Sequence, residues 1–160
     1  MNRQEKDLYP EIKDWFHQYL IEKFPGFRVT TTYQTSKISL DTYLKKINVE
    51  VKEAIGLGIK VDIVGVLQRG KTFRLAFVEV KDMPLTLTDL GQLWGYTELI
   101  NPVESFLVSS KGLGSLNYIL NILKREDLLI YGEKHEKMMR VCKWDIASKS
   151  LDYFSMVPKM

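Results

Sequence analysis

Hydrophobic residues recur at helical spacing in three segments of the chain. The first segment, residues 6–24, has the apolar positions Leu8, Ile12, Trp15, Phe16, Tyr19, Leu20 and Phe24. This spacing predicts an amphipathic helix that ends at Pro25-Gly26. A second helix is predicted over residues 86–100, because its apolar face stops at Asn101-Pro102. A third is expected over residues 115–125, with Ser115 as its N-cap.

Shorter apolar runs, separated by turn signals, predict β-strands. The expected strands are residues 27–33, 47–55, 59–67, 73–81, 103–109, 128–131, 139–146 and 151–156. Residues 36–44 are polar with scattered apolar positions, so we expect a loop there. Residues 147–150 have the length and polarity of a hairpin loop. The order of elements predicts an α/β fold with a mixed central sheet flanked by helices and a C-terminal hairpin.

Composition indicates one folded domain. The chain has 160 residues, of which 45% are hydrophobic and 27% are charged, with a net charge of +3. Its apolar runs are shorter than the roughly 20 residues of a membrane-spanning helix, and the polar start does not resemble a secretory signal. We therefore expect a cytoplasmic protein without membrane contact. The single cysteine, Cys142, excludes an internal disulfide and is expected in the core.

Ionisable residues interrupt two otherwise apolar strands. Asp62 lies in the first strand, and Glu79 and Lys81 lie in the next. A buried charge is costly unless it is paired or bound to a metal, so these positions require an explanation. Because side chains alternate along a strand, Glu79 and Lys81 point to the same face.

Two hairpin registers are open, and both gather the three side chains. If residues 69–72 form a four-residue loop, Gln68 pairs with Phe73 and Asp62 pairs with Glu79. A two-residue turn at Arg69-Gly70 instead makes Glu79 the diagonal neighbour of Asp62. Opposed Cβ atoms lie about 5 Å apart, which allows two carboxylates to share a hard cation. We expect Mg²⁺, with Mn²⁺ as a substitute, and expect Lys81 to orient water or phosphate oxygens.

The pattern of an acid, a turn, and then hydrophobic-Glu-hydrophobic-Lys resembles the PD-(D/E)XK nuclease superfamily. Val61 stands where the superfamily often has proline before the first acid. In the following helix, Gln92 and Tyr96 are four positions apart, similar to the Q-x-x-x-Y motif of RecB-type nucleases. The resemblance covers residues 61–96. It implies a restriction-endonuclease-like fold and metal-dependent hydrolysis of DNA, more as an endonuclease than an exonuclease, with Gln92 in the active site and Tyr96 contacting DNA.

The resemblance also implies a further acid from the first helix, and Glu11 is the candidate. Glu50 and Glu53, which precede Asp62, compete with it. Lys60 and Lys111 are candidate nucleic-acid contacts. Lys111 lies in the loop of residues 109–115, which is either a phosphate cradle or a helix-capping turn.

Two other interpretations remain open. In the first interpretation, Asp62 forms a structural ion pair with Lys81 or Lys60. In the second, the chain is a catalytically inactive nuclease-fold module that binds nucleic acid or assembles with a partner; the presence of all three motif residues argues against it. One domain of this length has no separate specificity domain, so we expect duplex recognition to need a homodimer or a protein partner.

Overall fold

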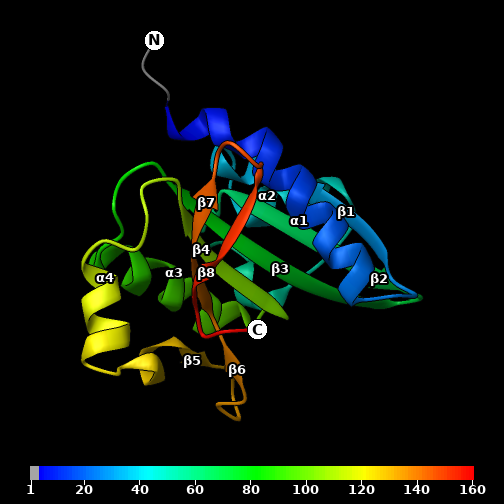
Figure 1. Ribbon diagram of the computed structural model, residues 1–160. Coiled ribbons are helices and arrows are strands. Elements are labelled where there is room, and N and C mark those ends of the chain that lie inside the picture. Colours follow the sequence, from blue (N-terminus) through cyan, green and yellow to red (C-terminus); the bar gives the residue numbers. More distant parts are fainter. Residues whose placement is uncertain (1–3) are drawn as a thin grey trace.

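The computed structural model describes residues 4–160 and has a mixed central sheet with helices on both faces (Figure 1). The sheet order is β1-β2-β3-β4-β7-β8. Its strands are β1 (Arg28–Thr32), β2 (Ile63–Arg69), β3 (Thr72–Lys81), β4 (Glu104–Ser109), β7 (Arg140–Asp145) and β8 (Ser150–Val157). The pairs β3–β4 and β4–β7 are parallel, and the other pairs are antiparallel. The predicted α/β class with a mixed sheet is confirmed.

The remaining elements surround this sheet. The α-helices are α1 (Tyr9–Lys23), α2 (Leu40–Lys46), α3 (Leu87–Ile100) and α4 (Ser115–Asn117), and α4 continues into the π-helix η4 (Tyr118–Ile122). The 3₁₀ turns are η1 (Glu5–Leu8), η2 (Gln34–Ser36), η3 (Lys52–Ala54) and η5 (Glu126–Leu129). A separate two-stranded sheet is formed by β5 (Ile130–Tyr131) and β6 (Lys137–Met138). None of the helices in residues 4–160 is long and apolar enough to span a bilayer.

Two hydrophobic clusters hold the layers together. On one face, α1 buries its apolar stripe against residues such as Ile63, Val78 and Phe106. On the other face, α3 packs with α2 and α4 against residues such as Val64 and Phe77. The helices flank opposite faces, as Figure 1 shows. Alternation along β3 therefore directs Phe77, Glu79 and Lys81 to the α3 side of the sheet.

The predicted first and second helices are confirmed, and their ends follow from local chemistry. Pro10 lies at the start of α1, where its missing N–H costs no helical hydrogen bond. Thr86 caps α3 in a reciprocal capping box with Asp89. Asn101 ends α3 in the left-handed region at φ 58°, and Pro102 prevents further helix.

Two predictions before β2 are wrong. Residues 36–44 are not a loop throughout, because Ser39 caps the short helix α2 by accepting a hydrogen bond from Thr42 N. Residues 47–55 are not a strand, since they form irregular chain and the turn η3. In both segments the apolar side chains are buried by packing on the α3-side cluster rather than by pairing in the sheet. Apolar content alone did not distinguish these two modes of burial.

Smaller corrections concern element ends. The strand expected at residues 59–67 pairs only from Ile63 onward. The strand expected at residues 128–131 is reduced to β5, because Leu128 and its neighbour belong to η5. Gly114, not Ser115, is the N-cap of α4, and Ser115 Oγ donates to the carbonyl of Leu85 at 3.5 Å. The C-terminal hairpin of β7 and β8 and the burial of Cys142 are confirmed.

The β2–β3 register decides where the predicted site residues meet. Gln68 pairs with Phe73, and the ladder continues back to the pair Ile63–Val78. This is the register expected for a four-residue loop over residues 69–72. The ladder extends one pair further, to Arg69–Thr72, so the turn itself consists of Gly70 and Lys71. One step beyond the ladder, Asp62 lies opposite Glu79.

Candidate functional site

Asp62 and Glu79 are joined by hydrogen bonds where β2 begins beside the end of β3. The backbone N–H of Asp62 donates to Glu79 Oε1 at 3.2 Å. The backbone N–H of Val80 donates to Asp62 Oδ2 at 2.8 Å. Glu79 is only 7% exposed, whereas Asp62 is half-buried. Each carboxylate is therefore fixed by the other strand's backbone, and the two acids share one small volume.

Tyr9 and Glu5 complete this cluster from the N-terminal side. The Tyr9 hydroxyl is 2.9 Å from Asp62 Oδ1 and 3.2 Å from Glu5 Oε2. One hydroxyl proton serves one acceptor at a time, and the shorter contact favours Asp62. Burial and the charge of Asp62 raise the pKa of Glu5. We define the carboxylate cluster as Glu5, Asp62 and Glu79, with Tyr9 holding Asp62 in place.

The electrostatics of the cluster disfavour two neighbouring negative charges. Burial raises the pKa of Glu79 well above its ordinary value, and its contact with Asp62 raises it further. The charge of Lys81 opposes this shift. Without a cation, the Asp62–Glu79 pair therefore retains a proton. A bound cation would replace that proton, because it favours the ionised form of both acids.

The oxygen donors suit a divalent cation that keeps part of its water shell. No group of at least three His, Cys, Asp or Glu side chains within residues 4–160 is arranged to enclose a metal. Mg²⁺ does not require such a group, since it is commonly held by one or two carboxylates together with water and substrate phosphate. Asp62 and Glu79 are the residues that would hold it. Zinc and other metals that prefer nitrogen or sulfur have no matching donors here.

Lys81 lies on the same strand face as Glu79 and is half-buried. Within residues 4–160, no ion pair of 4 Å or less joins Asp62 to Lys81 or Lys60. This geometry does not support the structural ion-pair interpretation of Asp62. Lys60 is exposed two positions before Asp62. Its position beside the cluster is compatible with a nucleic-acid contact, which remains a prediction.

Gln92 and Tyr96 lie on the flank of α3 that is opposite to Trp94. Trp94 Nε1 donates to the carbonyl of Ile130 at 3.0 Å, so the Trp94 flank faces β5. Gln92 is two positions away, about 200° around the helix, and therefore lies on the opposite flank. The helix α3 also contacts η3, in the chain segment that leads to Asp62. Gln92 is exposed, and Tyr96 packs partly against the α3-side core.

Glu11 is directed to another part of the sheet. Its Oε1 accepts a hydrogen bond from Trp144 Nε1 at 2.8 Å, on strand β7, which is two strands from β3. Glu50 and Glu53 are exposed in the segment before β2. Glu5, rather than any of these three, is the additional acid next to Asp62. Sequence reasoning missed Glu5 because it precedes the periodic part of the helix; its spacing of four from Tyr9 was the available signal.

The loop of residues 109–115 is tied to the chain that follows β3. Leu85 N donates to the carbonyl of Gly112 at 3.2 Å, and Gly114 lies so close to Leu85 that a Cβ would meet its oxygen at 2.4 Å. The N–H of Lys111 already donates to Ser109 Oγ. These contacts favour the structural turn over a phosphate cradle. The Lys111 side chain itself is exposed.

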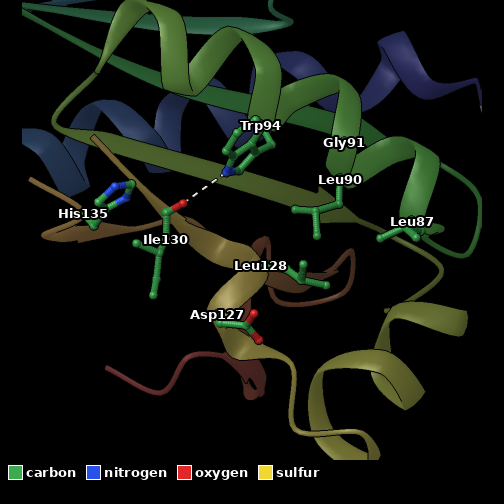
Figure 2. Close-up of a pocket in the computed structure, with 8 residues that line it drawn as sticks. All are labelled: Leu87, Leu90, Gly91, Trp94, Asp127, Leu128, Ile130 and His135. Carbon is green, nitrogen blue, oxygen red and sulfur yellow. Dashed lines mark hydrogen bonds between the residues drawn. The ribbon is translucent and has the colours of Figure 1, made fainter. Parts of the chain in front are cut away.

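An apolar hollow lies apart from the carboxylate cluster. It has a volume of about 530 Å³ and lies between α3 and the η5–β5 segment (Figure 2). Leu87, Leu90 and Trp94 line it from α3, with the indole N–H of Trp94 bonded to Ile130 as Figure 2 shows. None of the cluster carboxylates lines it. Its lining offers few polar groups and is unsuited to phosphate chemistry.

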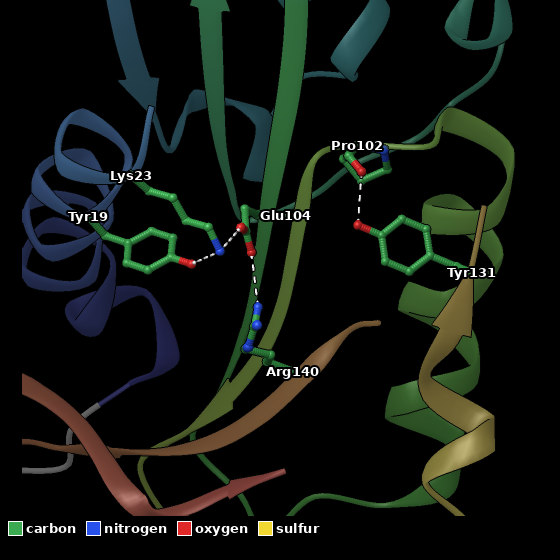
Figure 3. Close-up of polar contacts among 6 residues, drawn as sticks. All are labelled: Tyr19, Lys23, Pro102, Glu104, Tyr131 and Arg140. Atoms are coloured by element: carbon green, nitrogen blue, oxygen red, sulfur yellow. Dashed lines mark hydrogen bonds and ion pairs between the residues drawn. The ribbon is translucent and has the colours of Figure 1, made fainter. Parts of the chain in front are cut away.

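Glu104 is a second buried carboxylate. It lies at the start of β4, at the opposite end of the β3–β4 ladder from Glu79 and Lys81. Glu104 is 5% exposed and lies between Lys23 Nζ, at 2.7 Å, and Arg140 Nη1, at 3.3 Å (Figure 3). Tyr19 accepts from Lys23, so the end of α1 is joined to β4 and β7. Nearby, the Tyr131 hydroxyl donates to the carbonyl of Pro102. Glu104 is thus paired with two cations, in contrast to Asp62 and Glu79.

Comparisons with known proteins leave the family open. No protein-family model matches the chain, and a search of curated proteins finds no match. The functional argument therefore depends on the residues and their geometry.

Proposed function

We propose that this protein is a metal-dependent nuclease that hydrolyses phosphodiester bonds in DNA, with Asp62, Glu79 and Lys81 as its active site. The observation that carries the proposal is the pair of mutually hydrogen-bonded acids at the β2–β3 end, with Lys81 on the same face as Glu79. Neither acid has a cation within ion-pair distance among residues 4–160. A pair of hard oxygen donors that lacks such compensation is suited to Mg²⁺.

The topology supports the same proposal. A helix, an antiparallel β1-β2-β3 unit, the crossover helix α3 and the parallel strand β4 follow one another in the chain. This order agrees with the restriction-endonuclease-like fold implied by the PD-(D/E)XK resemblance of residues 61–96. Gln92 and Tyr96 share one flank of α3, opposite to Trp94, as the Q-x-x-x-Y spacing requires.

The residues have separate roles in the proposed reaction. Asp62 and Glu79 would hold Mg²⁺, which would stabilise charge on the attacked phosphate and acidify a bound water. Lys81 donates hydrogen bonds to phosphate oxygens as negative charge increases on them. Water adds its oxygen to phosphorus, the bond to one ester oxygen breaks, and that oxygen takes up a proton. The products are a phosphomonoester and an alcohol.

Cleavage assays with purified protein test the proposal. Supercoiled, linear, branched and single-stranded DNA, and single-stranded RNA, are incubated with Mg²⁺, Mn²⁺ or EDTA. We expect metal-dependent cleavage of DNA that falls by about 10²-fold or more in Glu79→Gln and Lys81→Ala, since each removes a group that acts in the transition state. Glu133→Gln, at an exposed acid in the β5–β6 loop, is the matched control and should retain the wild-type rate.

Circular dichroism and unfolding curves establish that each variant is folded. Undiminished cleavage by folded Glu79→Gln and Lys81→Ala would reject this active site. A wild-type protein that binds DNA but cleaves none of these substrates would instead favour the catalytically inactive binding module.

A further inference from the structure

A groove of mixed polar and apolar lining lies between the α4–η4 segment and the C-terminal hairpin. It has a volume of about 270 Å³ and is lined on one side by Asn117 and Asn121. On the other side, Lys143, Phe154 and Lys159 contribute to its lining. None of the described residues that line it is acidic. The groove thus combines cationic, amide and aromatic groups.

Strand register relates this groove to the proposed active site. Lys81 pairs with Ser109 across β3–β4, and Ser109 pairs with Lys143 across β4–β7. Residues paired in neighbouring strands point to the same face, so Lys143 shares the face of Lys81. Two strand spacings separate their backbones by about 10 Å. This is roughly the rise of three nucleotides along one strand of B-form DNA.

A bulge in the hairpin presents Phe154 to solvent. The β7–β8 register shifts between Val141 and Lys143, and Phe154 N donates to Asp152 Oδ1 at 3.1 Å. Ser155 Oγ enters the gap and accepts from Lys143 N at 2.8 Å. A bulge of this kind redirects a side chain that regular pairing would place elsewhere. Phe154 is 94% exposed, which leaves its ring free to stack.

The lysines near the groove are available to an anion. Lys143 and Lys111 are exposed, and Lys111 directly precedes Gly112 of the groove lining. Lys159 is exposed, and its Nζ donates to the backbone carbonyl of Phe154. Two acids of the β7–β8 hairpin accept hydrogen bonds from neighbouring residues.

Those two acids are Asp145 and Asp152. Asp145 accepts from Ser148, and Asp152 accepts from Phe154 N. Neither lines the groove. Both acids lie near Lys143, which pairs with Asp152 in the β7–β8 register, so the cationic character of the groove comes from its lining residues Lys143 and Lys159.

We propose that this groove binds a single strand of nucleic acid leading to or from the active site, with Lys143 and Lys159 contacting phosphates and Phe154 stacking on an unpaired base. The inference rests on the proposed nuclease function and specifies how its substrate is held. A cationic groove with an aromatic platform is the usual arrangement for binding single strands, because every base offers a face for stacking. A fully stacked duplex has no free base face for Phe154.

Binding without turnover tests the groove. A short fluorescein-labelled single-stranded oligodeoxynucleotide is titrated in EDTA, and anisotropy gives Kd at several salt concentrations. We expect Lys143→Ala/Lys159→Ala to weaken binding about tenfold and to reduce the salt slope by about 1.4, the value for two lost single-strand phosphate contacts. Phe154→Ala should weaken binding by about tenfold through lost stacking.

Matched controls come from exposed positions outside the groove. The double variant Lys71→Ala/Lys134→Ala removes two exposed lysines. Lys71 lies in the β2–β3 turn, at the end of β3 opposite to Lys81, and Lys134 lies in the β5–β6 loop. Leu99→Ala removes an exposed apolar side chain from α3. Both controls should bind as the wild type does. Because all substituted side chains are exposed, the folded state should be retained in every variant.

The outcomes separate this inference from the proposed function. The groove proposal is overturned if both groove variants bind with the affinity of the wild type, or if the wild-type protein does not bind single strands. Either result overturns it even if DNA is cleaved and Glu79→Gln is inactive. Equal losses for a duplex of the same sequence contradict a single-stranded occupant. Groove variants that lose binding while the wild type cleaves nothing leave the groove intact and reject the nuclease.

Discussion

At the residue scale, the two central acids impose an electrostatic cost on the folded protein that a cation would relieve. Glu79 is buried next to Asp62, and both accept hydrogen bonds from backbone N–H groups. Those N–H groups stabilise negative charge, whereas burial and the neighbouring acid disfavour it. For Glu79 the second effect is larger, since its pKa is raised.

Glu79→Gln should therefore stabilise the metal-free protein. In the folded state the Asp62–Glu79 pair keeps a proton, whereas the unfolded chain releases it once the pH exceeds the ordinary pKa of a glutamate. Wild-type stability therefore falls as the pH rises from that ordinary pKa toward the raised pKa of the folded state. The variant has no titrating group at residue 79. From pH 6 to pH 8 in EDTA, its advantage in unfolding free energy should grow by roughly 2–3 kcal/mol, because one retained proton changes stability by about 1.4 kcal/mol per pH unit. Urea unfolding at the two pH values measures this difference, and a constant difference would contradict it.

Tyr9 is expected to act by positioning Asp62. Tyr9→Phe removes the hydroxyl that lies 2.9 Å from Asp62 and 3.2 Å from Glu5 but keeps the ring. Loss of a group that orients a metal ligand commonly lowers metal affinity or activity by about 10–100-fold. The Mg²⁺ concentration for half-maximal cleavage should rise, while unfolding free energy falls by only about 1 kcal/mol. A fall in stability with an unchanged Mg²⁺ profile would assign Tyr9 a structural role alone.

The sequence allowed the approach of Asp62 and Glu79 to be derived, because strand alternation and hairpin pairing are regular. It did not identify Glu5 or Tyr9 as their neighbours. That proximity depends on how η1 and α1 cross the sheet, and no local pattern encodes such a crossing. Glu11, which the family resemblance favoured, bonds to Trp144 for the same reason.

At the element scale, the position of α1 depends on a close approach to β2. Gly65 has no side chain, and a Cβ there would lie 2.4 Å from Leu20 Cδ1. The absent side chain lets Leu20 of α1 pack directly on β2, while Tyr9 at the start of the same helix contacts Asp62. The approach of this helix therefore affects both the core and the carboxylate cluster.

Two glycine substitutions should have opposite effects. Gly65→Ala should destabilise the protein by about 1–3 kcal/mol, because Leu20 or α1 must move. Gly91→Ala, in α3, meets no atom within 4 Å and should stabilise by up to about 1 kcal/mol through helix propensity. Thermal unfolding of both variants measures the contrast. Equal effects would show that α1 does not depend on the missing side chain.

Long periodic segments were predictable, and short buried ones were not. The two long helices have apolar stripes that continue over several turns, so their period is clear. The helix α2 has seven residues, and its main signal is the Ser39 cap. Residues 47–55 are rich in apolar residues yet lie on the α3-side cluster without strand partners. Their conformation follows from tertiary packing, which local sequence does not specify.

At the scale of the whole molecule, a buried ion cluster that stabilises the fold and the residues of the proposed active site lie at opposite ends of the sheet. Glu104 pairs with Ala76 at one end of the β3–β4 ladder, and Lys81 pairs with Ser109 at the other. Five residues of strand separate these ends by about 17 Å. The buried ion cluster around Glu104 joins α1, β4 and β7, whereas Asp62 and Glu79 lie at the opposite end without a direct ion pair among the described residues.

Glu104→Ala should therefore lower stability without changing the chemistry. The substitution leaves Lys23 and Arg140 without their shared carboxylate, and Arg140 Nε already lacks a hydrogen-bond partner within the described residues. Removing one partner of a buried ion pair typically costs about 3–5 kcal/mol, because the remaining charge stays desolvated. Urea unfolding should show a loss of this order, while DNA cleavage by the folded variant stays within about twofold of wild type, since distant independent sites contribute additively. A large loss of cleavage under conditions where the variant is fully folded would mean that the two ends of the sheet are coupled, and that the ion cluster positions the active site through α1.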